Sequence, residues 1–189
     1  HANLKAMADF GESYEKVPIY LALAPNAANI LSDKLPRFAV TKDQNGMFRE
    51  ISQELSERVA WVDLSKTLAA HKKEEIFYRT DSHWTTLGAY YASQQLVESM
   101  QLDEAKTPKW EKYVVTNIFT GDLSLKSGYQ TGYQESIYIY TAKSDKEMPQ
   151  IVVDAGEGKI STLYDRTKLK EMDAYDLFLG GSKGMVNIR

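Results

Sequence analysis

The sequence predicts an α/β fold, with a parallel sheet and helices packed on its faces. Two short continuous apolar runs, residues 17–24 and 59–64, have the length and composition of strands buried in a parallel sheet. Stretches with apolar side chains at helical spacing, residues 3–16, 43–58 and 84–100, alternate with these runs. This alternation is the order expected when crossover helices connect parallel strands.

A second pattern begins after residue 101. Residues 107–165 are richer in Thr, Tyr, Ser and Gly, and their short β-prone pieces predict antiparallel strands or hairpins at 113–115, 137–140, 151–153 and 160–164. We expect residues 175–181 to return to the main body. The sequence thus predicts a single domain over residues 1–189 with a β-rich excursion at about 107–165. A short helix at 65–71 and a brief strand at 76–78 complete the expected elements.

Composition narrows the class of protein. The chain is 43% hydrophobic and 26% charged, which is typical of a globular domain. A net charge of −3 without a basic face makes nucleic acid an unexpected partner. No apolar run approaches the roughly 20 residues of a membrane helix, and no signal peptide is seen. Because the chain opens at His1 in an amphipathic pattern and closes at Arg189 after an apolar run, we expect both ends to be cut.

The segment at 76–91 carries the most chemical information. It holds His83, one of only three histidines, two residues after Asp81 and between a predicted strand and a predicted helix. A catalytic imidazole needs an acceptor at one ring nitrogen, which fixes its tautomer and stabilises its charged form. Residues i and i+2 of a helix do not face each other, so Asp81 reaches His83 only if the backbone turns between them.

Two other interpretations of the Asp81–His83 pair stay open at this point. Asp81 is a good N-cap residue, so it can simply cap the following helix, with His83 as a half-buried surface residue. Asp-x-His is also a fragment of metal sites, but only His1 and His71 remain as further imidazole ligands. We therefore expect no metal and no cofactor.

The whole motif is more specific than the pair. Residues 78–91, Tyr-Arg-Thr-Asp-Ser-His-Trp-Thr-Thr-Leu-Gly-Ala-Tyr-Tyr, resemble the signature of the bacterial DHHW family, with Ser82 in place of that family's first histidine. Residues 17–35, with their Leu-Ala-Pro-Asn turn, and residues 119–123, 126–128 and 176–181 are similar to further segments of the family in the same order. The resemblance covers nearly the whole chain.

The resemblance implies a fold and an activity. The fold is a three-layer SGNH-hydrolase-like parallel sheet with flanking helices and a β-rich insertion, incomplete at its C-terminus. Relatives among the alginate O-acetylation proteins use an Asp-x-His pair with a serine nucleophile. Carried over, Asp81 orients the ring and His83 is the general base, while the serine lies beyond Arg189. The chain alone is then expected to be inactive.

The same resemblance implies where the protein works and on what. We expect an esterase or O-acyltransferase acting on a cell-envelope glycan or another acylated surface polymer. We expect an extracytoplasmic bacterial protein, secreted or tethered by a membrane anchor upstream of His1. The alternative is a non-catalytic envelope module that binds glycan or a partner protein on a degenerate SGNH-like scaffold. The oligomeric state is not predicted.

Three further residues are weaker candidates for substrate or oxyanion contacts. Arg79 can steady Asp81 or bind an anionic group, or serve as a structural ion-pair partner. Asn26 follows a buried strand and is either a polar site residue or a turn residue. Ser182 stands where the family pattern has an asparagine, which places any oxyanion role there in doubt. Ser182 is also a poor nucleophile candidate, because no strand–Ser–helix elbow surrounds it.

Overall fold

The structure is a computed structural model of the 189-residue chain. It describes residues 2–55, 57–102, 110–129, 131–142, 152–154, 159–160, 162–182 and 186–188. The chain divides into two compact units. The first comprises His1–Ile76 and Leu87–Ala105, and the second comprises Phe77–Thr86 and Lys106–Arg189. The single domain expected from the sequence stays a prediction, and each unit is described by itself.

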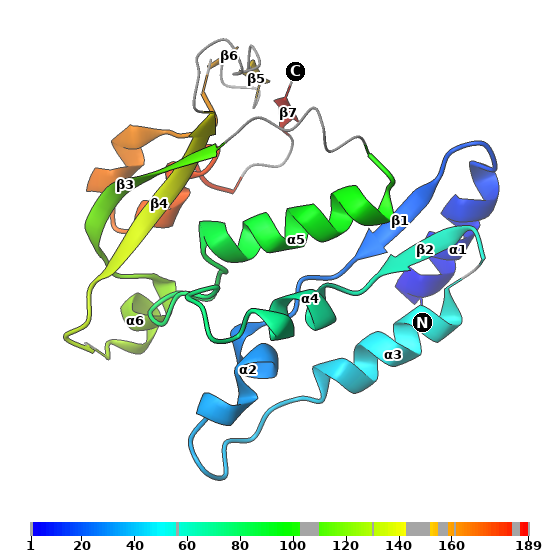
Figure 1. Ribbon diagram of the computed structural model, residues 1–189, viewed down its shortest axis with the longest axis horizontal. Coiled ribbons are helices and arrows are strands. Elements are labelled where there is room, and N and C mark those ends of the chain that lie inside the picture. The colour runs from blue at the N-terminus through cyan, green and yellow to red at the C-terminus, as the bar shows by residue number, and fades with distance from the viewer. Residues whose placement is uncertain are drawn as a thin grey trace. The chain divides into compact units, whose positions relative to one another are not determined.

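A parallel strand pair lies at the centre of the first unit. Strand β1 (Ile19–Ala22) pairs with β2 (Val59–Val62), with Ile19 opposite Val59 (Figure 1). Both strands fall inside the apolar runs of the sequence, so the predicted parallel sheet is confirmed. Val59 and Val62 are buried, as expected for β-branched side chains on a covered sheet.

Helices account for most of the rest of this unit. They are α1 (Ala2–Ser13), α2 (Ala27–Ile30), η1 (Ser32–Lys34), α3 (Gln44–Glu54), α4 (Leu64–Ala70) and α5 (Thr86–Ser99). Side chains that accept backbone N–H groups mark where several of these helices begin, α3 and α4 among them. Asp43 accepts from Gly46 at the start of α3, and Asp63 accepts from Ser65 at the start of α4. Helices α3 and α5 lie within the predicted ranges 43–58 and 84–100 and are shorter at both ends, whereas α1 begins one residue before the predicted range 3–16 and ends three residues before its end.

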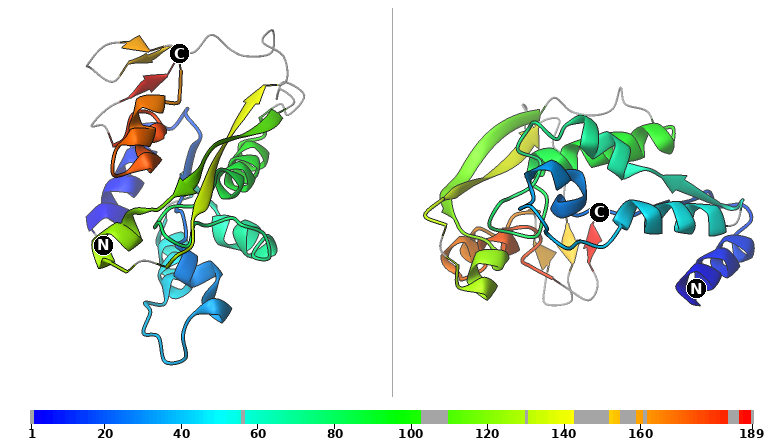
Figure 2. Two further views of the ribbon diagram at one scale, coloured as in Figure 1. Left: turned by 90° about the vertical axis from the view of Figure 1, so that its left-hand side faces the viewer. Right: turned by 90° about the horizontal axis from the view of Figure 1, so that it is seen from below.

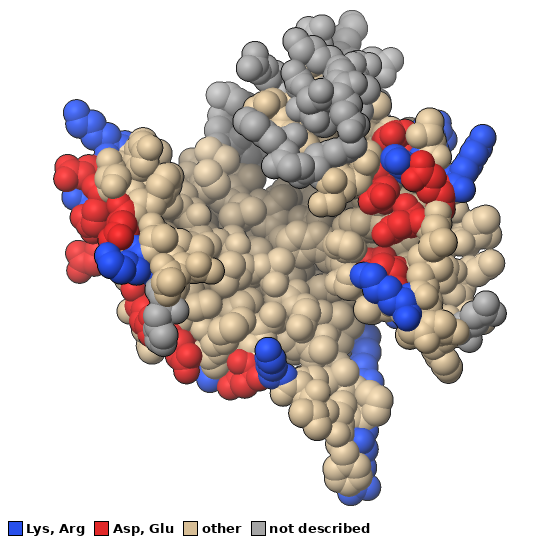
Figure 3. Space-filling view, turned by 180° about the vertical axis from the view of Figure 1, so that it is seen from behind, with Lys and Arg blue, Asp and Glu red and all other residues tan. Residues whose placement is uncertain are grey.

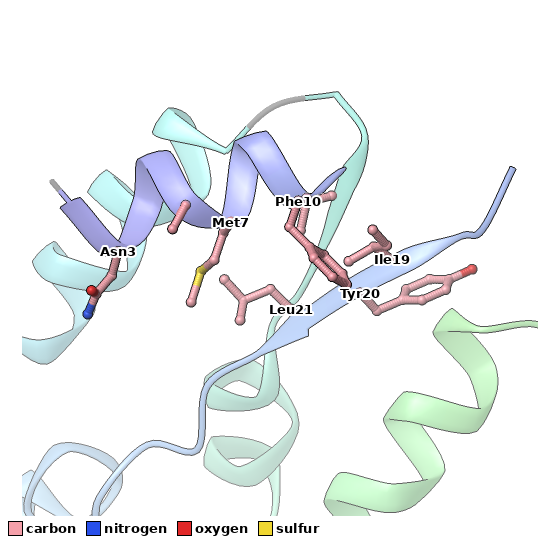
Figure 4. A pocket seen from close by; sticks show the side chains of 8 residues that line it. Asn3, Met7, Phe10, Ile19, Tyr20 and Leu21 are labelled. Carbon is pink, nitrogen blue, oxygen red and sulfur yellow. The ribbon is translucent and has the colours of Figure 1, made fainter. Parts of the chain in front are cut away.

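An apolar cavity of about 390 Å³ separates α1 from β1. Figure 4 shows Ile19 and Leu21 pointing toward α1, where Met7 and Phe10 face them, while Tyr20 between them points the other way. This alternation is the two-residue period of a strand. The four residues of β1 are therefore shared between two faces, and none of them is fully buried.

The second unit is built on a long antiparallel ribbon. Strand β3 (Trp110–Phe119) pairs with β4 (Glu135–Ala142), and α6 (Asp122–Ser127) lies in the connection between them (Figures 1 and 2). A small sheet in the order β6-β5-β7 contains Lys159–Ile160, Val153–Asp154 and Asn187–Ile188. The strands predicted at 113–115 and 137–140 lie within β3 and β4. Residue 151, at the start of the piece predicted at 151–153, and residue 161, within the piece predicted at 160–164, lie outside the described residues.

Two short 3-10 helices complete the core of the second unit. They are η3 (Arg166–Lys170) and η4 (Ala174–Leu177). The core consists of Tyr78, Phe119, Ile137 and Leu177, all nearly inaccessible to solvent. Leu177 is buried in this core, and backbone hydrogen bonds join Asp165 to Leu177 and Leu179 to Leu163. The expectation that residues 175–181 return to the main body stays a prediction.

The surface carries charges of both signs. Figure 3 shows acidic and basic side chains close to one another on the surface that it draws. Within the described part of the chain, no helix has the length and apolar character needed to cross a membrane.

Candidate active site

Residues 77–84 form a closed loop of the second unit. A single antiparallel bridge joins Phe77 to Trp84, and the Tyr78 N–H donates to the His83 carbonyl at 3.3 Å. The predicted strand at 76–78 is therefore wrong. The backbone reverses immediately after Tyr78, so these residues form one bridge instead of a ladder. Helix α5 begins only at Thr86, beyond the loop.

The loop turns tightly between Asp81 and His83. Oδ1 of Asp81 accepts the backbone N–H of His83 at 2.8 Å, which is the geometry of an Asx turn. The same oxygen lies 2.5 Å from Nδ1 of His83. The turn thus brings the carboxylate of Asp81 and the imidazole of His83 together, which is the backbone turn that their spacing in the sequence makes necessary for contact between them.

The second oxygen of Asp81 is also engaged. Oδ2 accepts the backbone N–H of Asp122 at 3.0 Å. In return, Oδ1 of Asp122 accepts the N–H of Ser82 at 3.0 Å. Because α5 begins at Thr86, Asp81 does not cap it, and the simple capping interpretation is wrong. Asp81 is only 1% exposed, so these N–H groups stand in for the water that the carboxylate has lost.

Lys126 completes the link on the solvent side. Its ammonium lies 2.6 Å from Oδ2 of Asp122, which is mostly covered, while the lysine itself is exposed. The hydrogen bond from Lys126 lowers the pKa of Asp122 below that of an ordinary aspartate. Asp122 therefore stays ionised and continues to accept the Ser82 N–H across the neutral range.

Gly121 allows α6 to approach Asp81 closely. A Cβ at position 121 would lie 2.2 Å from Cβ of Asp81 and 2.5 Å from its Oδ2. Its φ of −90° is open to any residue, so the constraint is steric. The contact between Asp81 and the N–H of Asp122 depends on a residue without a side chain at this position.

Glu135, the first residue of β4, holds the other side of the loop. Its carboxylate accepts the N–H of Arg79 at 2.8 Å, the N–H of Thr80 at 2.8 Å and the hydroxyl of Thr80 at 2.5 Å. The Thr80 hydroxyl oxygen then accepts the Gly121 N–H at 3.0 Å. Glu135 and Gly121 are therefore joined through Thr80, directly beside Asp81.

The His83 ring is held on one edge and one face. Its side chain is 49% exposed, whereas that of Asp81 is 0% exposed. The ring of Tyr175 stacks on it with centroids 4.0 Å apart and planes 9° apart. Burial raises the pKa of Tyr175 to about 12, with a further contribution from the charges of Asp81 and Asp173. The structure shows no hydrogen bond to Nε2 of His83 from the residues that it describes, and the other ring nitrogen, Nδ1, meets Asp81.

The weaker candidates have different surroundings. Arg79 is exposed, and its guanidinium lies 4.4 Å from the centroid of the Tyr133 ring. Asn26, in the first unit, caps α2 by accepting the Asn29 N–H, which supports its interpretation as a turn residue. Ser182 is exposed and follows Leu179, Gly180 and Gly181, all with positive φ. Any contact of these residues with substrate stays a prediction.

Several residues that shape the site were not singled out from the sequence. Gly121, Asp122 and Tyr175 lie in or beside segments that resemble the family, but the resemblance gave them no role. The contact between Thr80 and Glu135 could not be predicted, because nothing in the local sequence pattern indicates a partner 55 residues away. Within the described part of the chain, no group of three or more His, Cys, Asp or Glu side chains is placed to hold a metal ion.

Comparison with solved structures shows the same fold. A DHHW family protein from Eubacterium siraeum is 22% identical and aligns with 100% of this chain and 63% of its own, with a TM-score of 0.72. PatB1 from Bacillus cereus is 18% identical and aligns with 100% of this chain and 66% of its own, with a TM-score of 0.74. The O-acetyltransferase domain of AlgJ from Pseudomonas putida is 20% identical and aligns with 75% of this chain and 55% of its own, with a TM-score of 0.56. The chain thus spans about two thirds or less of the length of these proteins.

Comparison with protein families identifies the family of this chain. No curated protein matches the chain. Residues 5–162 match the family model described as the SGNH hydrolase-like domain of the acetyltransferase AlgX. This match covers most of the sequence, including the closed loop and its partners from α6 and β4. The chain therefore belongs to the AlgX family of SGNH hydrolase-like acetyltransferase domains.

Proposed function

We propose that this chain supplies the general base, His83, and its orienting carboxylate, Asp81, to a Ser-His-Asp triad. The reaction is acyl transfer or ester hydrolysis on a cell-envelope glycan or another acylated surface polymer. One observation carries the proposal: a fully buried carboxylate oxygen lies 2.5 Å from Nδ1 of a half-exposed imidazole. Membership of the AlgX family supports the acyl chemistry.

The hydrogen bonds determine which ring nitrogen reacts. With Asp81 as acceptor, Nδ1 carries the proton and the lone pair resides on Nε2. Nε2 then takes the serine proton as the serine oxygen bonds to the acyl carbon. When the ester C–O bond breaks, Nε2 gives this proton to the departing alcohol. An acceptor hydroxyl or water reverses these steps and releases the acyl group. Asp81 stabilises the imidazolium formed in between.

The nucleophilic serine of this proposal lies outside the 189 residues, as the family resemblance implies. The PatB1 structure carries a sulfonyl adduct, so a sulfonyl fluoride is a suitable probe for a reactive serine in the full-length protein. The AlgJ domain is an O-acetyltransferase, which favours acetyl as the acyl group. A glycan in the cell envelope and an extracytoplasmic location are parts of the same proposal.

The test compares acetyl-ester hydrolysis by the full-length protein and two variants. We expect His83→Ala to lower kcat by roughly 10³-fold or more, as in serine hydrolase triads. His71→Ala is the matched control, because His71 also meets a carboxylate, Glu74, at 2.7 Å but belongs to the first unit. Equal rates for the wild type and His83→Ala would refute the triad. Retained glycan binding in that case would favour the non-catalytic module.

A further inference from the structure

We infer that Tyr175 is a positioning residue for His83, holding the imidazole in the plane in which Nδ1 meets Asp81. The evidence begins with the parallel stack of the two rings, 4.0 Å between centroids and 9° between planes. Its catalytic meaning rests on the proposed function, but the positioning itself is a property of the folded chain. The residue lies far from the Asp-x-His motif in the sequence and on a different element, η4.

The half-exposed ring of His83 needs a second restraint. One hydrogen bond at Nδ1 fixes the position of that atom but leaves the ring free to tilt about it. A flat aromatic surface against one face prevents this tilt and keeps the ring plane aligned with the carboxylate. Together, Asp81 and Tyr175 fix one edge and one face of the half-exposed ring.

Tyr175 is itself held firmly. Asp173 accepts its backbone N–H at 3.0 Å and caps η4. Its ring meets Tyr78 edge-on at 6.1 Å and contacts Phe178 at 4.9 Å between centroids. Leu177, two residues further along the same helix, is fully buried in the core of the second unit. The stacking ring therefore packs against the core of the second unit.

The phenol does not compete with His83 for protons. Its burial raises its pKa to about 12, so it is neutral wherever an imidazole works as a base. The charged groups near the pair are the carboxylates of Asp81, Asp122 and Asp173 and the ammonium of Lys126. Tyr175 thus offers His83 an uncharged stacking surface among charged groups, and its hydroxyl is not required for the stack.

Three variants of the 189-residue chain separate positioning from general packing. Tyr175→Leu removes the stacking ring, and Tyr175→Phe keeps the ring without its hydroxyl. Phe178→Leu is the control, because Phe178 lies in the same aromatic cluster, against Tyr164 and Tyr175, without contacting His83. Nitrogen-15 NMR reports the His83 tautomer, and proton shifts of the imidazole report the ring current of the stacked tyrosine. Thermal unfolding is measured alongside.

We expect the wild type, Tyr175→Phe and Phe178→Leu to show a predominant Nδ1–H tautomer and upfield-shifted imidazole protons. Tyr175→Leu should lose the upfield shift and show a mixture of both tautomers, while unfolding at a temperature close to that of Phe178→Leu. If Tyr175→Leu keeps the wild-type tautomer, or if Phe178→Leu loses it equally, the inference is wrong.

Kinetics of the full-length protein separates this inference from the proposed function. We expect Tyr175→Leu to lower kcat by about tenfold to a hundredfold with little change in KM, as for a displaced catalytic group. Tyr175→Phe should keep the wild-type kcat. If His83→Ala has no effect, the proposed function fails while the NMR result still decides the positioning. If His83→Ala abolishes activity and Tyr175→Leu behaves as Phe178→Leu does, only the inference fails.

Discussion

At the scale of single residues, Asp81 is the most constrained group of the site. It is buried and accepts three N–H groups, two from the backbone and one from the His83 ring. Asp81→Asn keeps the volume but turns one acceptor into a donor. The variant should therefore leave a backbone N–H unpaired or hold the ring in the wrong tautomer.

We expect Asp81→Asn to lower kcat of the full-length protein by roughly 10³–10⁴-fold, the size seen when a triad aspartate is replaced. The imidazole tautomer, measured by nitrogen-15 NMR, should change in the same variant. Asp9→Asn, at an exposed ion pair on α1, is the control and should leave both quantities unchanged. A fully active Asp81→Asn would show that the carboxylate does not orient the base.

The next prediction concerns the steric effect of a side chain at position 121. Gly121→Ala places a methyl group 2.2 Å from Cβ of Asp81, so the loop or α6 must move. We expect the free energy of unfolding to fall by about 1–3 kcal/mol, the usual cost of overpacking. The Asp81–His83 hydrogen bond should weaken at the same time, as read from the imidazole tautomer.

Gly132→Ala is the matched control for this substitution. Position 132 has a positive φ of 65° but open space around the added carbon. It should therefore show only the backbone cost, about 1 kcal/mol, and keep the wild-type tautomer. If Gly121→Ala also keeps the wild-type tautomer, the close approach of α6 does not position Asp81.

The pKa of Asp122 gives a dependence on pH. Its pKa is lowered in the folded chain, first by the hydrogen bond from Lys126. A lowered folded pKa means that its stabilising contribution is complete above the unfolded value and is lost as the pH falls through the folded value. Lys126→Met should raise the pKa of Asp122 in a carbon-13 carboxyl titration, so that acid releases the Ser82 N–H at a higher pH. Lys168→Met, at an exposed ion pair with Glu171, should leave this titration unchanged.

At the scale of elements, the start of β4 anchors the loop. Glu135→Gln replaces one of the two oxygens that accept from Arg79 and Thr80 with an amide that can only donate. We expect a loss of about 1–3 kcal/mol in the free energy of unfolding, the cost of a buried unpaired group, measured by denaturant titration. Glu12→Gln, exposed on α1, should cost under about 0.5 kcal/mol. Equal effects of the two variants would show that Glu135 does not hold the loop.

The elements that the sequence predicts well are those whose conformation depends on residues close together in the sequence. The apolar runs around Ile19 and Val59 predict strands because each run is complete in itself, and helical spacing predicts α3 and α5 for the same reason. The site loop has no such local cause. Its conformation depends on bonds from Ser82 to Asp122 and from Thr80 to Glu135, partners 40 and 55 residues away. The Asp81–His83 pair was predictable because both members lie within one motif, whereas Tyr175 was not.

At the scale of the whole molecule, the site loop is separated in sequence from its partners. Residues 77–86 lie between two stretches of the first unit but pack in the second. A chain that ends at residue 105 contains Asp81 and His83 but lacks Asp122, Glu135 and Tyr175. We expect the imidazole of such a chain to show mixed tautomers by nitrogen-15 NMR, in contrast to the 189-residue chain. A predominant Nδ1–H form in the shorter chain would mean that the Asx turn alone orients the ring.

The missing side chain at position 121 also affects how the sequence tolerates mutation. Any glycine codon becomes an alanine codon by a single base change, so this position is one step from a methyl group that the carboxylate beside it cannot accommodate. Gly46 in α3 would also meet a carboxylate, that of Asp43, but Asp43 is exposed, whereas Asp81 is buried. In a gene copy freed from selection for chemistry, a change at this codon would disturb the Asp81–His83 pair of the proposed site at a cost of about 1–3 kcal/mol in the free energy of unfolding.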